Sequence, residues 1–388
     1  MLTNHFLTSD ERAELALFSQ SLDRFCTDRI EPFYRDWEKA GQVPRELFAQ
    51  MGEQGFLCAD VPEAYGGVGA SVNFSFAVIE VLSRRGYAGF VGGLQVHTDI
   101  IPPYLLHFGT EAQRQHWLPR MVSGEAIAAI GMTEPGAGSD LKNIRTHARR
   151  DGDSYVINGS KIFISNGQNA DLIVLAAKTD PAAGAKGVSL FLVDTTTPGF
   201  SRGRRLEKIG QHAGDTSELF FEDMRVPADA LLGGVEGQGF VQMMRELPRE
   251  RLIIGVQGVH AARGALDVTL DYVKERQAFG QAVAQFQNTR FTLAQVATEI
   301  AAGEAFLNAG VAAYVRGELS PEAASAIKLH ASELFSRVSD QCLQLFGGYG
   351  YMAEYPISRF WTDSRVLRIY GGTSEIMKEL VARALLGR

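Results

Sequence analysis

The chain has 388 residues, of which 45% are hydrophobic and 21% charged, and its formal net charge at pH 7 is −7. This length exceeds what one hydrophobic core usually serves, so we expect two or three domains in a soluble globular protein. The negative charge argues against a general affinity for nucleic acid or for an anionic membrane surface.

Cysteine and histidine spacing indicates neither disulfides nor a metal site. Cys26, Cys58 and Cys342 lie far apart and form no CxxC pair, which suits a reducing compartment. The first residues show no basic segment followed by an apolar one, as a signal peptide would. No apolar run approaches the roughly 20 residues that span a bilayer. We therefore expect a cytoplasmic protein without a membrane span.

Residues 1–126 show helical patterns. Thr8 and Glu11 form a T-x-x-E capping box before apolar residues at helical spacing. Pro44 is expected to open a second helix, and residues 71–86 and 110–121 are predicted to form further helices. The sequence therefore predicts an N-terminal α-helical domain.

Residues 127–235 change to a β pattern. Segments 171–179 and 188–196 are short, rich in β-branched residues and bounded by turn sequences. Several short strands with frequent turns favour a small barrel or sandwich.

Residues 236–388 return to helices, and these are long. One is predicted from Pro248 to Arg276, one over 285–316, one from the cap at Ser320 to the glycines at 347–348, and a last one after Thr373. Helices of this length predict a four-helix bundle, whose outer faces often serve oligomerisation. The fold class expected for the whole chain is α+β.

Residues 247–255 read LPRERLIIG and pose a choice for Glu250. Pro248 suits the first position of a helix, and a carboxylate there interacts favourably with the helix dipole. Glu250 is then a solvated charge at a helix start. The alternative is a carboxylate that takes part in chemistry, and this stretch alone does not decide between them.

Five further stretches follow one another on this α–β–α background: MTEPGAGSD at 132–140, KIFISNG at 161–167, RQAFG at 276–280, QLFGGYGY at 344–351 and RIYGGTSEIM at 368–377. In this order, and over almost the whole chain, they resemble the acyl-CoA dehydrogenase family. Together they are far more specific than any one alone. The resemblance implies FAD bound without a covalent bond between the β domain and the C-terminal bundle.

The resemblance also implies which residues meet the flavin ring. Met132, Thr133 and Ser139 would line the isoalloxazine ring or the neighbouring substrate. Phe163 stands where many members have tryptophan, so it would cover a ring face without an indole donor. Ser165 would reach the N5 region of the flavin.

Family members are usually tetramers built as dimers of dimers, in which a neighbouring subunit completes the flavin site. Several positions here match those that reach across to the adenosine diphosphate part or contact the pyrophosphate. The former are Arg276, Phe279, Gln287, Gln344 and Gly348, and the latter are Thr373 and Glu375.

Many members place the catalytic glutamate directly after the tyrosine of RIYGGTSE, where this chain has Gly371. One subset, which includes long-chain and isovaleryl-CoA dehydrogenases, has glycine there and carries the base on another helix, at the position of Glu250. The resemblance thus implies that Glu250 removes the α proton of an acyl thioester. The N–H of Gly371, with a flavin ribityl hydroxyl, would polarise the thioester oxygen.

Two further arginine positions are candidates for the coenzyme A part of the substrate. Arg251 matches a position near the CoA-binding mouth, with a structural ion pair as the alternative. The RGRR run at 202–205 would meet CoA phosphates or form a solvated turn.

The implied reaction converts acyl-CoA to trans-2-enoyl-CoA and passes electrons to an electron-transfer flavoprotein. The alternatives are an oxidase or flavin monooxygenase on the same scaffold, or a non-catalytic protein that binds acyl-CoA or flavin. Gly89, Gly92 and Gly93 leave room for an acyl chain or allow close helix packing. With the placement of Glu250, the first interpretation favours a medium-to-long or branched chain.

Overall fold

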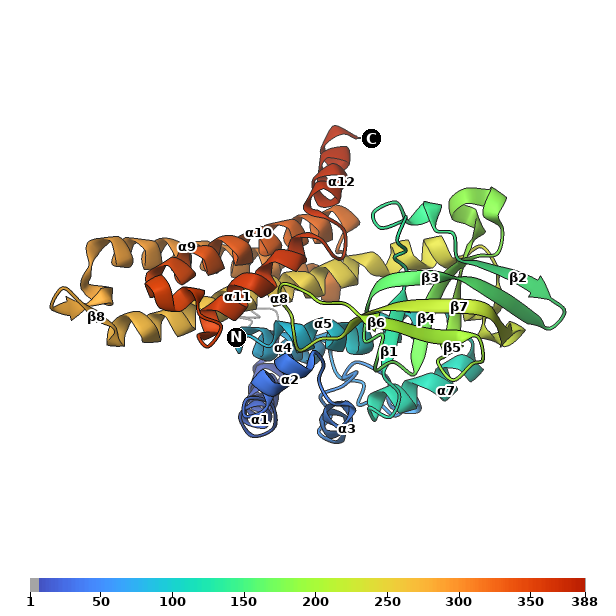
Figure 1. Cartoon of the computed structure of the whole chain (residues 1–388), viewed down its shortest axis with the longest axis horizontal. Helices are drawn as coiled ribbons and strands as arrows, with labels where there is room; N and C mark the ends of the chain where they lie inside the picture. The colour runs from blue at the N-terminus through green and yellow to red at the C-terminus, as the bar shows by residue number, and fades with distance from the viewer. Residues whose placement is uncertain (1–6, 388) are drawn as a thin grey trace.

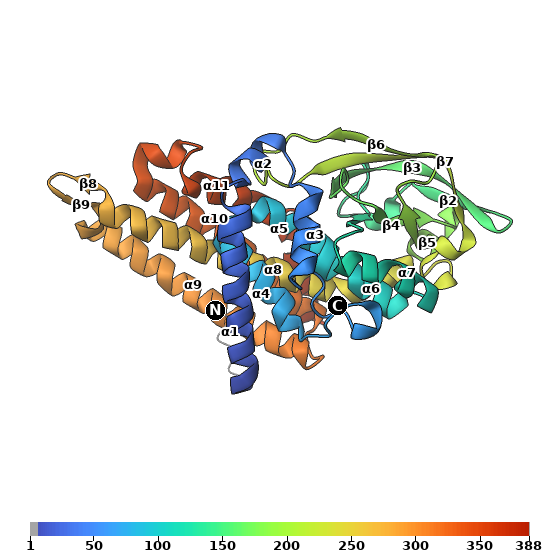
Figure 2. The same cartoon turned by 90° about the horizontal axis from the view of Figure 1, so that it is seen from below.

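The structure, a computed structural model, describes residues 7–387 and shows three regions (Figures 1 and 2). Helices from the first third of the chain lie below a long helical bundle, and a curled sheet stands at one end of both (Figure 1). The expectation about the first six residues lies outside the described part of the chain. Within residues 7–387, no helix combines the length and apolar character needed to cross a membrane.

The N-terminal region is helical, as predicted. The capping box is confirmed, because the N–H of Glu11 donates to the Thr8 hydroxyl at 3.2 Å and Glu11 caps in return. The helix predicted after Pro44 begins at the next residue. The helices are α1 (Ser9–Phe25), α2 (Tyr34–Ala40), α3 (Arg45–Glu53), α4 (Val72–Arg84), α5 (Ala88–Gln95), α6 (Ile101–Phe108) and α7 (Glu111–Val122), with π-helical turns at Cys26–Ile30 and Val96–Ile100.

The middle region is a curled sheet with the strand order β1-β4-β2-β3-β7-β6, in which β5 also pairs with β4. Alternate residues of β4 enter two different cores: Leu172 and Val174 join the helices, whereas Ile173 and Leu175 join a core within the sheet. Burial on both faces explains why this strand reads as an unbroken apolar run. The strands are β1 (Ala128–Gly131), β2 (His147–Asp151), β3 (Ser154–Ser165), β4 (Leu172–Lys178), β5 (Val188–Asp194), β6 (Phe200–Arg205) and β7 (Thr216–Pro227).

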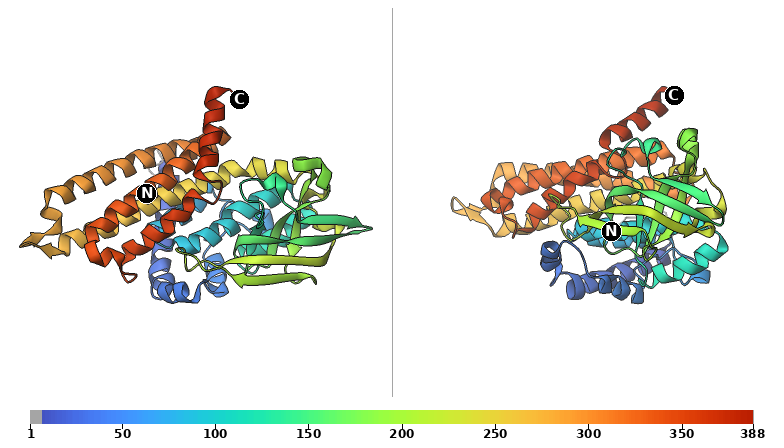
Figure 3. Two further views of the ribbon diagram at one scale, coloured as in Figure 1. Left: turned by 45° about the horizontal axis from the view of Figure 1, so that its top comes forward. Right: turned by 45° about the vertical axis from the view of Figure 1, so that its right-hand side comes forward.

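The C-terminal region is built on three long helices that run side by side, while α12 projects from them (Figures 1 and 3). The shorter α11 packs against α10 and α8. The predicted cap at Ser320 is confirmed, since its hydroxyl accepts from the N–H of Ala323 at 3.1 Å. The elements are α8 (Gly239–Glu275), hairpin strands β8 (Gln277–Ala278) and β9 (Gln281–Ala282), α9 (Gln287–Val315), α10 (Pro321–Phe346), α11 (Pro356–Ser364) and α12 (Ser374–Leu386).

The predicted start of the first bundle helix is wrong. Helix α8 begins at Gly239, nine residues before Pro248, and continues through the proline. Proline usually breaks a helix because it lacks an N–H and its ring crowds the preceding turn. Here extensive burial of the segment that follows holds the helix together, since residues 249–262 are all buried.

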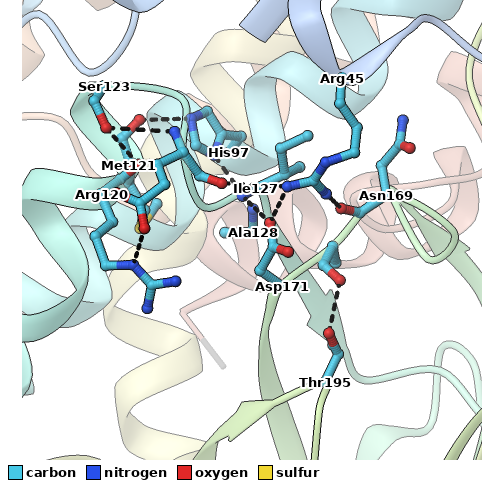
Figure 4. Close-up of polar contacts among 12 residues, drawn as sticks. Arg45, His97, Arg120, Met121, Ser123, Ile127, Ala128, Asn169, Asp171 and Thr195 are labelled. Atoms are coloured by element: carbon cyan, nitrogen blue, oxygen red, sulfur yellow. Dashed lines mark hydrogen bonds and ion pairs between the residues drawn. The ribbon is translucent and has the colours of Figure 1, made fainter. Parts of the chain in front are cut away.

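Polar contacts, some exposed and some buried, join the N-terminal helices to the sheet (Figure 4). Arg45 of α3 forms an ion pair with Asp171 at 2.7 Å, just before β4. The ring of His97 accepts from the N–H of Ala128 at 3.2 Å and bonds the carbonyl of Met121 at 3.0 Å. Burial lowers the pKa of His97 to about 4, so the ring is neutral, with one donor and one acceptor nitrogen. These contacts fix β1, and with it the loop at 132–134.

Candidate active site

Helix α8 carries Glu250 into the interior of the protein. Glu250 is only 8% exposed. The hydroxyl of Tyr104, from α6, donates to Glu250 Oε1 at 3.0 Å. The interpretation of Glu250 as a solvated charge at a helix start is therefore wrong, because the residue is buried and lies well inside α8.

The surroundings of Glu250 change its acidity. Burial raises the pKa of this carboxyl to about 7, and the hydrogen bond from Tyr104 opposes the rise. The charge of Glu246 raises the pKa further, and that of Arg251 lowers it. A carboxylate with a pKa near 7 is a stronger base than an exposed one and is still about half ionised at neutral pH.

Gly371 lies against the same stripe of α8 as Glu250. A Cβ atom at Gly371 would stand 2.3 Å from Cδ1 of Ile254. Ile254 follows Glu250 by four residues, so both side chains occupy one face of the helix. The two positions named from the sequence as alternative places for the base are thus close in space, and Ile254 fills the room that a side chain at 371 would take.

Substituting Gly371 should cost stability for two reasons. Its φ of +64° disfavours any residue with a Cβ, and the new methyl group would push Ile254 aside. We expect Gly371→Ala to lower the free energy of unfolding by about 1–3 kcal/mol, measured by denaturant titration. Gly55→Ala is the matched control, because Gly55 has a φ of +71° with open space around it. Equal losses in the two variants would show that the contact with Ile254 contributes nothing.

Hydrogen bonds to buried side chains of α8 and α10 fix the loop that contains Gly371. Lys328 of α10 donates to the carbonyl of Gly372 at 2.6 Å, and burial lowers the pKa of this lysine to about 8. The hydroxyl of Tyr370 donates to Oε1 of Gln257 at 2.7 Å. Neither contact was expected from the sequence, since lysine is among the residues least often buried.

The arginines named for coenzyme A make contacts within the protein. Arg251 is buried and donates to the hydroxyl of Ser325 on α10 at 3.1 Å. Arg202 donates to the carbonyls of Gly167 and Ala170 from strand β6. The expectation of a turn at 202–205 is wrong, because these residues belong to strand β6, although their arginine side chains are exposed as expected.

The glycines of α5 serve close packing. A Cβ at Gly93 would stand 2.2 Å from Oδ1 of Asn166, and one at Gly89 would stand 3.0 Å from backbone atoms of the loop at 211–213. A Cβ at Gly92 would also meet this loop, at 3.3 Å. The interpretation that these glycines leave room for an acyl chain is therefore wrong: the space is filled by the neighbouring β region.

The loop expected to contact the flavin is supported by a buried lysine. Lys161 of β3 donates to the carbonyl of Met132 at 3.0 Å and to Oε1 of Glu134 at 2.8 Å. The carbonyl of Thr133 accepts from the N–H of Ile162 at 3.0 Å. The loop is thus bonded on both sides of Thr133, while Ser139, further along, is exposed.

Phe163 has the properties of a ring-covering side chain. It is 64% exposed although it lies within strand β3, and its φ is +61°. A positive φ is unusual for a bulky residue, and such strain tends to occur at functional sites. Ser165 closes the same strand and is half-buried. An exposed apolar ring beside a rigid loop fits a flat apolar partner such as isoalloxazine.

The residues expected to reach the adenosine diphosphate part of the flavin form a second group, at the end of the bundle that carries the β8–β9 hairpin (Figure 1). Arg276, Gln344 and Gly348 line an open pocket of about 530 Å³, where the guanidinium of Arg276 lies 5.1 Å from the ring centre of Tyr349. Phe279, in the hairpin beside them, is 97% exposed. Gln287 begins α9 and is exposed.

Thr373 and Glu375 lie close to Gly371, at the start of α12. The hydroxyl of Thr373 caps the helix by accepting from the N–H of Ile376 at 3.3 Å. Glu375 lies in the first helical turn and is exposed. The N-terminus of a helix favours anionic groups, which fits a pyrophosphate nearby. Among the described residues, His, Cys, Asp and Glu form no group of three or more that could hold a metal ion.

Family models cover nearly the whole chain. The N-terminal, middle and C-terminal domains of acyl-CoA dehydrogenase match residues 12–125, 129–224 and 237–386. The long-chain specific acyl-CoA dehydrogenase, mitochondrial, of Sus scrofa is 45% identical over 96% of this chain and 87% of its own length.

Solved structures agree with these matches. The acyl-CoA dehydrogenase from Geobacillus kaustophilus superimposes with a TM-score of 0.95 at 46% identity, covering 99% of this chain and 100% of that one. A glutaryl-CoA dehydrogenase from Mycobacterium smegmatis in complex with FADH2 gives a TM-score of 0.92 at 30% identity, over 100% and 97% of the two chains. Fold and site together define a flavin-dependent oxidoreductase that uses FAD. The chain belongs to the acyl-CoA dehydrogenase family.

Proposed function

We propose that Glu250 is the base of this acyl-CoA dehydrogenase and removes the α proton of an acyl-CoA thioester to give trans-2-enoyl-CoA. The observation that carries the proposal is a buried carboxylate with a raised pKa on the helix face that Gly371 contacts. The N–H of Gly371 is proposed to donate to the thioester oxygen, which stabilises the developing enolate. Bound FAD would supply the acceptor for the β hydrogen, which leaves as hydride.

The residues that would hold FAD are those of the two groups described above. The first group consists of Phe163, Ser165 and the loop at 132–134, and it would bind the flavin ring. The second group, at Arg276, would bind the adenosine diphosphate part. Gly371 and the start of α12 are proposed to lie beside it, near the pyrophosphate. Arg251 and Ser139 are proposed to contact the substrate. The proposed domains are residues 1–126, 127–235 and 236–388, and the ranges of the three family models support this division.

The two groups support a shared site in an oligomer. The open pocket at Arg276 borders the β8–β9 hairpin, and Phe163 belongs to β3. The hairpin and the sheet stand at opposite ends of the molecule (Figure 1). One FAD molecule can contact both the Phe163 group and the Arg276 group only if the Arg276 pocket of a second subunit lies against the sheet of the first. We therefore propose a homotetramer, built as a dimer of dimers, in which Phe279 crosses the interface. Its near-complete exposure in the single chain supports this role.

The proposed electron acceptor is an electron-transfer flavoprotein, which fits the family. Burial of the base argues against a monooxygenase, a reaction that has no need of one. We also propose a cytoplasmic location, supported by three free, buried cysteines. The mammalian relative is named as mitochondrial, so localisation by fluorescence of a tagged chain in its own cells would test this point.

The proposed substrate is a medium-to-long or branched acyl-CoA. Placement of the base on α8 and the 45% identity to a long-chain specific enzyme support this class. Mixing the yellow holoenzyme anaerobically with a panel of CoA esters should bleach the flavin, fastest with esters of eight or more carbons or with a methyl branch. Highest kcat/KM on butyryl-CoA would contradict the substrate class. Absence of bleaching with every ester would contradict the dehydrogenase reaction itself.

A further inference from the structure

Tyr104 is a fully buried tyrosine whose hydroxyl, among residues 7–387, bonds the carboxylate of Glu250 at 3.0 Å and no other side chain. It lies in α6, 146 residues away in the sequence. Its ring packs against Phe108, with ring centres 6.2 Å apart. The packing needs only an aromatic ring, and the same ring without its hydroxyl would fill the same space. The hydroxyl is therefore present at this buried place because it bonds Glu250.

A second polar contact joins α6 to α8 one helical turn away. His107 Nδ1 lies 2.7 Å from Oε1 of Glu246, which precedes Glu250 by four residues. The charged or titratable groups that act on Glu250 are Tyr104 from α6 and Glu246 and Arg251 from α8. Arg251 in turn contributes to lowering the pKa of Lys328 on α10.

The geometry points to Tyr104 as a positioning residue that orients the Glu250 carboxylate and favours its ionised form. This inference rests on the proposed role of Glu250 as base. The phenol donates to Oε1, so Oε2 is the oxygen left to receive the α proton. A hydrogen bond to an ionised acceptor is stronger than one to a neutral acceptor, so the bond stabilises the carboxylate before proton transfer. Burial and Glu246 act in the opposite direction on its pKa.

Infrared difference spectroscopy of the holoenzyme without substrate tests the inference independently of turnover. The carbonyl band of the protonated Glu250 carboxyl is assigned by its absence in Glu250→Gln, and its loss with rising pH is followed. Because a hydrogen bond to a charged group is lost, Tyr104→Phe should move this titration upward by about one to two pH units. Tyr155→Phe is the matched control, since Tyr155 is a buried tyrosine that donates to Glu236 in the β region. A titration in Tyr104→Phe that coincides with that of wild type would overturn the inference.

The pH profile of anaerobic flavin reduction gives a second readout. In Tyr104→Phe, the pH at the midpoint of the acid limb of kcat/KM should rise by the same one to two units. This is about the shift expected when a hydrogen bond to a charged group is lost. His107→Gln should leave the limb in place, because His107 bonds Glu246 and not Glu250. If Tyr104→Phe lowered the rate equally at every pH and left the midpoint of the acid limb unchanged, Tyr104 would be a packing residue and the inference would fail. If His107→Gln abolished the acid limb, the limb would report His107 and not Glu250, which would also overturn the inference. Full activity in Glu250→Gln would instead contradict the proposed base, whatever the infrared result for Tyr104.

Discussion

Glu250→Gln should slow anaerobic flavin reduction by an acyl-CoA about 10²- to 10⁴-fold, the usual contribution of a general base, while the flavin stays bound. Glutamine keeps the shape of the side chain and still accepts the Tyr104 hydrogen bond, but it cannot take a proton. Stopped-flow absorbance of the flavin measures the rate directly.

Glu246→Gln is the matched control for this substitution. Glu246 lies one turn earlier on α8, is also buried and bonds His107. We expect this variant to keep its rate within about tenfold, because it lacks only a charge that raises the pKa of Glu250. If the rates of the two variants were exchanged, with Glu246→Gln inactive and Glu250→Gln active, the assignment of the base would be wrong.

Lys161→Met should have the largest effect on stability. The lysine is 1% exposed and lies 2.8 Å from Glu134, and burial lowers its pKa to about 8. Burial is the largest single influence on Glu134 and would raise its pKa, but the charge of Lys161 and the hydrogen bonds from Lys161, Thr146 and Arg145 together hold that pKa below its ordinary value. Removing one partner of a buried pair leaves an uncompensated charge. We expect a loss of about 3–5 kcal/mol in the free energy of unfolding, together with weaker flavin binding.

The double variant Lys161→Met/Glu134→Gln separates charge from packing. It removes both charges. The two carboxylate oxygens of Glu134 accept from the N–H groups of Arg145 and Thr146, whereas the single amide oxygen introduced at position 134 can accept from only one of them. Denaturant unfolding should therefore show that the double variant recovers part, but not all, of the stability that the single variant loses. A double variant as unstable as Lys161→Met would show that the packing of the lysine stem, and not its charge, supports the loop.

Local signals in the sequence predicted much of the fold. The capping box at Thr8, the cap at Ser320 and the stop at Gly347 depend on neighbouring residues and are confirmed. The β-branched residues and flanking turn sequences of segment 171–179 likewise predicted a strand, which is β4. Pro248 misled because its local effect is opposed by tertiary burial of the helix that contains it. The length of that helix is decided by packing, which no short stretch records.

In the candidate site, too, some residues were predicted from the sequence and others, which depend on tertiary contacts, were not. Glu250 and Gly371 were identified as a pair because position 371 lacks the carboxylate that many family members have there, and position 250 supplies one instead. Their proximity in the structure, through Ile254, supports that pairing. Tyr104 was missed because an isolated tyrosine in an apolar helix gives no sign of a partner 146 residues away. The glycines of α5 were misjudged because the residues that fill the space beside them come from the β region.

The central claim is that Glu250 removes the α proton, and hydrogen exchange at the α carbon tests it most directly. Holoenzyme would be incubated anaerobically in D₂O with an acyl-CoA whose β carbon carries no hydrogen, so that only proton removal and return can occur. Mass spectrometry of the recovered ester then counts the deuterium. The wild type should incorporate deuterium at the α carbon, and Glu250→Gln with bound flavin should incorporate none above the uncatalysed rate. Equal incorporation by the two proteins would show that another group takes the proton.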